Sequence, residues 1–129
     1  MTRKFLAEFI GAFSLTFVGG GAIIATSGEN LVIIALAHGI ILAVMIAAMM
    51  HVSGAQFNPA VSIALAARGL QPWSQAFGYT IFQVIGGIVA ALLLKATMVP
   101  AFEYANTHIG ETLGIYSGTQ GPEMISAWR

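Results

Sequence analysis

The chain has 129 residues, of which 57% are hydrophobic and only 8% are charged, and its formal net charge at pH 7 is zero. A soluble domain carries roughly 25% charged residues, and a small globule has a large surface to cover, so this composition favours a membrane protein. The balanced charge, without a basic cluster, argues against a nucleic-acid partner. There is no cysteine, which excludes disulfides, thiolate zinc sites and cysteine nucleophiles in these residues.

Three apolar segments of about 20 residues each are long enough to cross a hydrocarbon core of about 30 Å. We expect membrane spans at residues 5–26, 31–50 and 72–95, with Pro72 in the first turn of the third. The first segment follows a short basic start, as in a secretory signal. However, it is longer than the roughly 7–15 apolar residues of a signal and contains Glu8, so we interpret it as a retained span.

A shorter apolar segment lies between the second and third spans. Its helical part, residues 59–67, would reach about 14 Å, or half of a bilayer. A polar lead-in precedes it, so we predict a re-entrant loop and half-helix over residues 53–67 that enters the membrane and returns to the same side. Irregular backbone at that depth is tolerated only where protein covers it or water reaches it. The segment therefore predicts a water-filled cavity.

The half-helix begins with an Asn-Pro pair. Asn58 suits the N-cap and Pro59 the first helical position, which is an ordinary helix start. At the membrane centre such a start directs the positive end of the helix dipole into the cavity, and the Asn58 NH₂ group remains a free donor. Together these features would repel cations and orient a neutral solute. Gly54, Ala55 and Gln56, which we expect to be extended, would offer carbonyl acceptors.

Two segments resemble a known family. SGAQFNPAVS (residues 53–62) is similar to the first Asn-Pro-Ala loop of the aquaporin, or major intrinsic protein, family, and AEFIGAF (residues 7–13) to its first-helix signature. The resemblance implies an all-α membrane protein with three transmembrane helices and one re-entrant half-helix, which is one inverted repeat of the aquaporin fold. Residues 1–97 would form the N-terminal half of that fold, and residues 98–129 a polar extracytoplasmic loop or tail.

The resemblance also implies the pore. The pore-lining residues that match by position are Asn58, Gly54, Ala55, Gln56 and His38, and the signature triplet is Asn58, Pro59 and Ala60. His38 matches the second-helix position of the selectivity filter, where histidine is similar to the plant tonoplast type and favours water and small neutral solutes such as ammonia over glycerol. Gln56 departs from the family, which commonly has histidine there.

Two further positions match structural residues of the family. Glu8 resembles a buried first-helix glutamate that braces the re-entrant loop, and Gln83 a recurrent position in the third helix. Glu8 could instead extend to the membrane surface, and His38 could be a packing residue, so both alternatives stay open. His51, at the end of the second span, is expected to be interfacial. The two histidines are thirteen positions apart, which places them on nearly opposite helix faces, so no metal site is expected.

The expected function is a passive channel, or part of one, for water and other small neutral solutes, without cofactors. No catalytic triad or phosphate-binding loop is present, so an enzyme is not expected. The alternatives are a non-conducting membrane fragment or assembly subunit, and half of a secondary transporter with discontinuous helices.

The length of the chain bears on its assembly. It holds one half of the family's pattern and stops about where a fourth span would begin, so we expect a truncated full-length channel rather than a true half-protein. The resemblance implies tetramers of full-length chains, whereas a true half would need a second copy in the opposite orientation. The positive charges give a weak preference for a cytoplasmic N-terminus in the cell membrane. They are Arg3, Lys4 and Arg68 on one side and Lys95 and Arg129 on the other.

Overall fold

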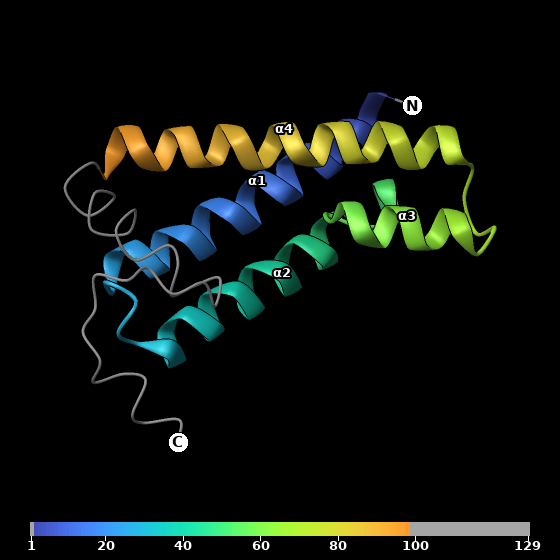
Figure 1. The fold of residues 1–129 in the computed structure, drawn as a ribbon. Helices are drawn as coiled ribbons and strands as arrows, with labels where there is room; N and C mark the ends of the chain where they lie inside the picture. Colours follow the sequence, from blue (N-terminus) through green and yellow to red (C-terminus); the bar gives the residue numbers. More distant parts are fainter. Residues whose placement is uncertain (1, 99–129) are drawn as a thin grey trace, which may run out of the picture.

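The computed structural model describes residues 2–98, in which every regular element is an α-helix. The helices, shown in Figure 1, are α1 (Thr2–Ala25), α2 (Leu31–Ser53), α3 (Pro59–Ala67) and α4 (Trp73–Thr97). The predicted polar tail, residues 98–129, lies outside this range except for its first residue. The all-α fold class is thereby confirmed for the described part of the chain.

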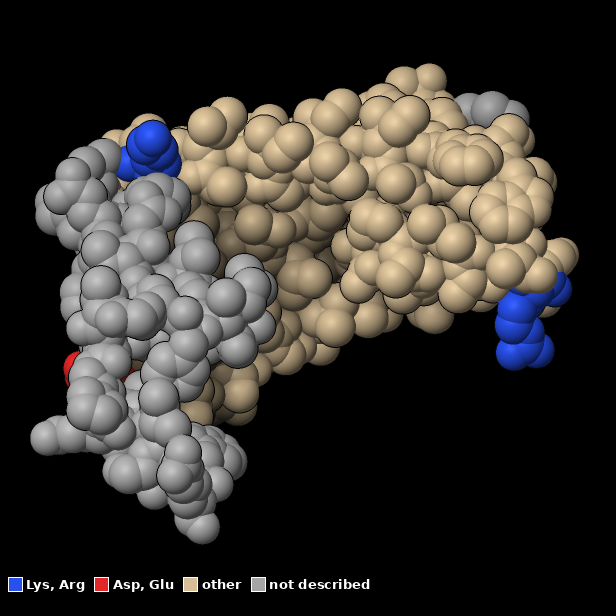
Figure 2. Space-filling view, viewed as in Figure 1, with Lys and Arg blue, Asp and Glu red and all other residues tan. Residues whose placement is uncertain are grey.

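Three of the helices are long and apolar enough to cross a membrane. α1, α2 and α4 have 24, 23 and 25 residues, with mean hydropathies of 1.6, 2.8 and 2.0. At 1.5 Å per residue each is about 35 to 38 Å long, more than a hydrocarbon core of about 30 Å. Figure 2 shows Lys and Arg only at the two ends of the visible face, with uncharged side chains between them, as a spanning bundle requires.

The helix ends differ from the predicted spans in small ways. α1 begins at Thr2 and therefore includes the basic residues that hydropathy leaves out, and α2 continues to Ser53. Pro72 is the N-cap of α4, with φ −65° and ψ 144°, rather than a residue of its first turn. A helix extends as far as its backbone hydrogen bonds allow, whereas a hydropathy pattern marks only its apolar part.

α1 lies at the centre of the bundle and packs against both α2 and α4. α1 and α4 run in parallel and approach closely at Gly86, where an added Cβ would lie 2.5 Å from the carbonyl oxygen of Phe9. Within the first half of each helix, the ring of Phe5 stacks on Phe82 at 5.3 Å and meets Tyr79 edge-on at 5.9 Å between centroids. The other two described helices pack on this parallel pair, α2 on α1 and α3 on α4.

The short helix α3 packs on α4 and, within residues 2–98, has no contact with α2. It lies beside the first half of α4 and runs back toward the end of the molecule where α1 and α4 begin (Figure 1). The contact between Ser62 and Gln83 fixes this register. Gln83 is ten residues beyond Trp73, or about 15 Å along α4. α3 therefore begins near the middle of the bundle and runs to the end of the bundle where α1 and α4 begin.

Candidate functional site

The loop that connects α2 with α3 is left-handed at Gly54, Ala55 and Phe57, so the extended backbone that we predicted is wrong at Gly54 and Ala55. Gly54 caps α2 with φ 91°, and Ala55 and Phe57 have φ of 48° and 49°. A left-handed backbone suits a glycine C-cap but strains residues that carry a Cβ. Such strain persists only where surrounding contacts hold the backbone in place. The hydrogen bonds of the loop to Glu8 supply those contacts.

The carboxylate of Glu8 is fully buried and accepts four hydrogen bonds. Its Oε1 accepts from the hydroxyl of Ser53 at 2.6 Å and from the N–H of Gln56 at 3.0 Å. Its Oε2 accepts from the N–H of Phe57 at 2.6 Å and from the side-chain NH₂ of Gln83 at 2.7 Å. The carboxylate thus joins α1 to the end of α2, to the loop and to α4, and it does not extend to the surface.

α3 begins at the Asn-Pro pair. Asn58 has an extended backbone, and its Oδ1 accepts a hydrogen bond from the N–H of Ala60 at 2.9 Å, while Pro59 occupies the first turn. Asn58 is exposed, and its side-chain NH₂ group donates no hydrogen bond to any residue between 2 and 98. The amino end of α3 therefore presents an unpaired donor beside its positive dipole end.

The depth of this helix start follows from its contact with α1. The ring of Phe57, which is 4% exposed, lies directly against Gly11, where a Cβ would collide with it. Gly11 is nine residues beyond Thr2, or about 14 Å along a helix that is about 36 Å long. The tip of the loop therefore lies more than a third of the way along α1, well inside the length of the spanning helices.

Three carbonyl groups of the loop have no donor among the residues that the structure describes. They are the carbonyls of Gly54, Ala55 and Gln56. The face drawn in Figure 2 is hollowed between α2, α3 and α4, and α3 begins at the border of that hollow (Figure 1). Free acceptors and a free donor in one short segment can together replace the hydrogen-bond partners that a small polar molecule has in water.

A second network, based on Gln71, holds α3 to the connection that follows it. The side-chain NH₂ of Gln56 donates to Oε1 of Gln71 at 2.8 Å. The NH₂ of Gln71 donates to the carbonyl of Ser62 at 2.7 Å and to Oε1 of Gln56 at 3.3 Å. The side chain of Gln56 is therefore engaged with α3 and its return connection, which gives a role to the residue that departs from the family pattern.

Sequence reasoning missed several members of these networks. Ser53 and Ser62 were visible as polar residues beside apolar runs, and both are buried. Tyr79 is fully buried and donates from its hydroxyl to the carbonyl of Ser53 at 2.8 Å. Tyr79 and Gln71 had no signal of their own, because a tyrosine in a membrane helix or a glutamine in a turn is ordinary.

His38 of α2 lies apart from this site, and His51, two residues before Ser53, makes no hydrogen bond to the site residues within the described chain. His38 is half-buried, its Nδ1 lies 2.9 Å from the carbonyl oxygen of Ile34 in its own helix, and its Nε2 edge packs against Gly19 of α1. Gly19 is eleven residues beyond Glu8, or about 16 Å along α1. The structure therefore brings Glu8, Gln56 and Gln83 together but places His38 elsewhere, and His51 is exposed at the other end of α2.

The whole sequence has clear relatives. A family profile described as "Major intrinsic protein" matches residues 1–125. Aquaporin Z of Rhodopseudomonas palustris is 42% identical over 126 residues, which cover 92% of this chain and 52% of that protein. Aquaporin NIP3-1 of Arabidopsis thaliana is 42% identical over 97 residues, which cover 72% of this chain and 30% of that protein.

A third relative has a name that refers to glycerol. The glycerol uptake facilitator protein-like 6 of Lactiplantibacillus plantarum is 39% identical over 110 residues, which cover 85% of this chain and 50% of that protein. The chain thus spans about half the length, or less, of these relatives. With three long apolar helices and a profile match over nearly every residue, the chain belongs to the major intrinsic protein family and is an integral membrane protein.

Proposed function

We propose that the chain forms one half of a passive membrane channel for water and other small neutral solutes. The observation that carries the proposal is the amino end of α3, which lies deep along α1 and combines the unpaired NH₂ group of Asn58 with free loop carbonyls. Channel activity, rather than catalysis, is also the function that the names of the aquaporin relatives suggest.

The proposed mechanism uses donors and acceptors in sequence. The carbonyls of Gly54, Ala55 and Gln56 accept hydrogen bonds from a passing molecule, and Asn58 donates one to its oxygen. The positive end of the α3 dipole repels cations at the same point. A neutral solute that both donates and accepts is therefore favoured over an ion, which loses its hydration without compensation.

For selectivity we propose water first, with His38 as the filter residue of α2. Glycerol appears only in the name of one relative, whereas aquaporin appears in the others cited. His38→Trp is expected to slow water flux because the larger ring narrows the passage. Unchanged or faster water flux would mean that His38 does not line the passage and only packs against Gly19.

The remaining half of the channel has two proposed sources. One is the rest of a longer chain, since the relatives are about twice as long, and full-length chains of this kind would assemble as tetramers. The other is a second copy of this chain inserted in the opposite orientation. In either case we propose that the protein resides in the cell membrane with a cytoplasmic N-terminus.

The test is osmotic swelling of vesicles that contain the purified chain, followed by stopped-flow light scattering. Water flux well above that of bare lipid, with a low activation energy, is expected where a second copy completes the pore, whereas a pore completed by a longer chain should conduct only in the full-length protein. Flux equal to that of bare lipid would instead indicate a non-conducting membrane fragment, and saturable, ion-coupled uptake would indicate half of a transporter.

A charge substitution tests the mechanism in the same vesicles. Asn58→Asp places a negative charge at the start of α3 and should admit cations that the original chain excludes. Asn30→Asp is the matched control, because Asn30 caps α2 in the same way, accepting from the N–H of Ile33 at 3.0 Å. Equal ion exclusion in both variants would mean that Asn58 does not lie on the permeation path.

A further inference from the structure

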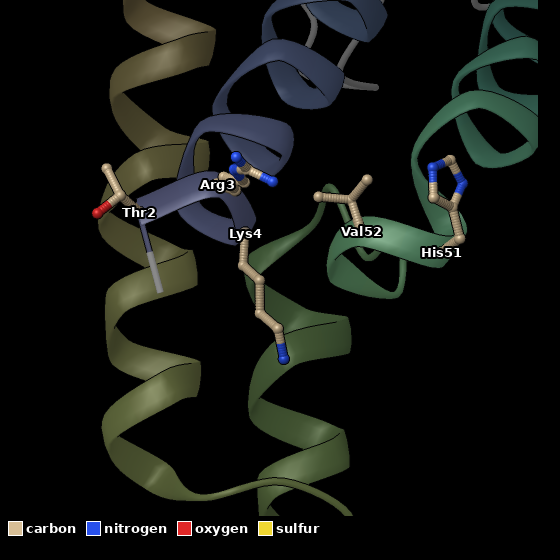
Figure 3. A pocket seen from close by; sticks show the side chains of 5 residues that line it. All are labelled: Thr2, Arg3, Lys4, His51 and Val52. Atoms are coloured by element: carbon tan, nitrogen blue, oxygen red, sulfur yellow. The ribbon is translucent and has the colours of Figure 1, made fainter.

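A second polar site lies at the end of the bundle where α1 begins. An open pocket of about 610 Å³ is lined by Thr2, Arg3, Lys4, His51 and Val52. Figure 3 shows Arg3 and Lys4 in the first turn of α1, facing the last turn of α2 with Val52 and His51 across the gap. Arg3 extends toward Val52, and the imidazole of His51 forms the outer rim. No lining residue of the pocket belongs to the loop between α2 and α3 or to α3 itself.

Neither positive charge of this pocket has a carboxylate of the described residues directed to it. The acidic residues within residues 2–98 are Glu8 and Glu29. Glu8 is buried and saturated by its four donors, and Glu29 lies in the connection at the opposite end of α1. Arg3 and Lys4 are both exposed and both line the pocket, although their side chains point in different directions in Figure 3. Two fixed positive charges in one concave surface favour an anionic ligand.

The pocket also lies at the depth of lipid headgroups. α1 and α4 exceed the hydrocarbon thickness by several ångström, so their first turns extend into the interfacial region. Trp73, the first residue of α4, is 50% exposed at the same end of the bundle. Tryptophan is enriched at the membrane–water interface, which supports this placement of the end.

We propose that this pocket binds the phosphate group of an anionic lipid headgroup. The guanidinium of Arg3 matches two phosphate oxygens, and Lys4 supplies a second cation. Basic pockets between transmembrane helices are typical sites for acidic headgroups. The volume is sufficient for a glycerophosphate group, and the open side faces the interface from which such a lipid would enter. The proposal concerns the membrane end of the protein and does not depend on conduction.

The experiment is a lipid-binding measurement on the full purified chain. Bound phosphatidylglycerol is counted against phosphatidylcholine by native mass spectrometry after titration in detergent. We expect the double variant Arg3→Gln, Lys4→Gln to bind phosphatidylglycerol about tenfold or more weakly, since each basic contact with an anionic lipid contributes about 1 kcal/mol. Arg68→Gln and Lys95→Gln are the matched controls, because neither residue lines the pocket, and both should change binding by less than about twofold.

Three results would overturn the proposal. If Arg68→Gln weakens lipid binding as much as the double variant does, binding depends on the total positive charge at this end of the bundle and not on the pocket. If the double variant binds normally, the pocket takes no headgroup. Inorganic phosphate is added as a competitor, and displacement of the lipid at equal concentration would assign the pocket to free phosphate instead. Circular dichroism of the double variant verifies that the helices are intact.

Discussion

Glu8 is the residue on which the local structure depends most. Its carboxylate offers only acceptors, and all four of its partners are donors, so the pairing is complete. Glu8→Gln replaces one acceptor with a donor and leaves buried N–H and O–H groups unpaired, at a cost of about 1–3 kcal/mol for each. We expect a clear loss of thermal stability in detergent. Glu29→Gln, at an exposed site, is the control and should have a melting temperature close to that of the unmodified chain.

The amide pair of Gln56 and Gln71 permits a double-mutant cycle. Each side chain donates to the other, so either alanine variant removes the same pair of bonds. We expect a coupling free energy of about 0.5–1 kcal/mol between the two substitutions, the usual size of a hydrogen bond between helices in a membrane. Reversible unfolding in mixed micelles measures it. Strict additivity of the two variants would mean that the pair makes no net contribution.

At the residue scale the sequence is informative where a single position decides the outcome. Asn58 and Pro59 specify a helix start by their own chemistry, and the structure has α3 beginning there. The left-handed backbone at Ala55 and Phe57 could not be predicted, because neither residue prefers it. That conformation is stabilised by Glu8, which lies 49 residues before Phe57 and carries no local signal for it.

At the element scale, the contact between α1 and α4 depends on a small residue. A Cβ at Gly86 would lie 2.5 Å from the carbonyl oxygen of Phe9 and 3.2 Å from the N of Phe13, both of which are backbone atoms that cannot rotate away. Gly86→Ala should therefore push the two helices apart and destabilise the protein by about 1–3 kcal/mol, as overpacking does. Gly39→Ala, in α2, is the control, because nothing lies within 4 Å of the added atom. Equal stability of the two variants would contradict the close approach.

The lengths of the helices were easier to predict than their partners. Hydropathy marked three spans, and only their ends moved by a few residues. The central position of α1 was not predictable from hydropathy, because α2 has the higher mean hydropathy, 2.8 against 1.6, yet is the less buried of the two. Apolar surface is no guide to burial when the solvent is lipid, and helix association there follows small residues and polar pairs.

For the whole molecule, the path of the chain across the membrane can be tested directly. Since the chain has no cysteine, single cysteines can be introduced without removing others. We expect Thr2→Cys and Gly69→Cys to react with an impermeant thiol reagent from one side of the membrane, and Ser27→Cys from the other. Labelling of Gly69→Cys from the side of Ser27→Cys would mean that α3 does not return to its side of entry.

The order of synthesis gives the buried carboxylate a further consequence. Glu8 leaves the ribosome long before its acceptors are satisfied, since its last donor, on Gln83, follows 75 residues later. A charged group within an isolated spanning helix is costly, about 3 kcal/mol at the helix centre on insertion scales, and Glu8 lies about 9 Å inside the start of α1. The first helix is therefore expected to remain at the translocon, with the carboxylate of Glu8 still hydrated, until the third spanning segment has been synthesised. Assembly of this fold would then be a late, collective event, and a nascent chain stalled before residue 83 would be easily withdrawn from the membrane.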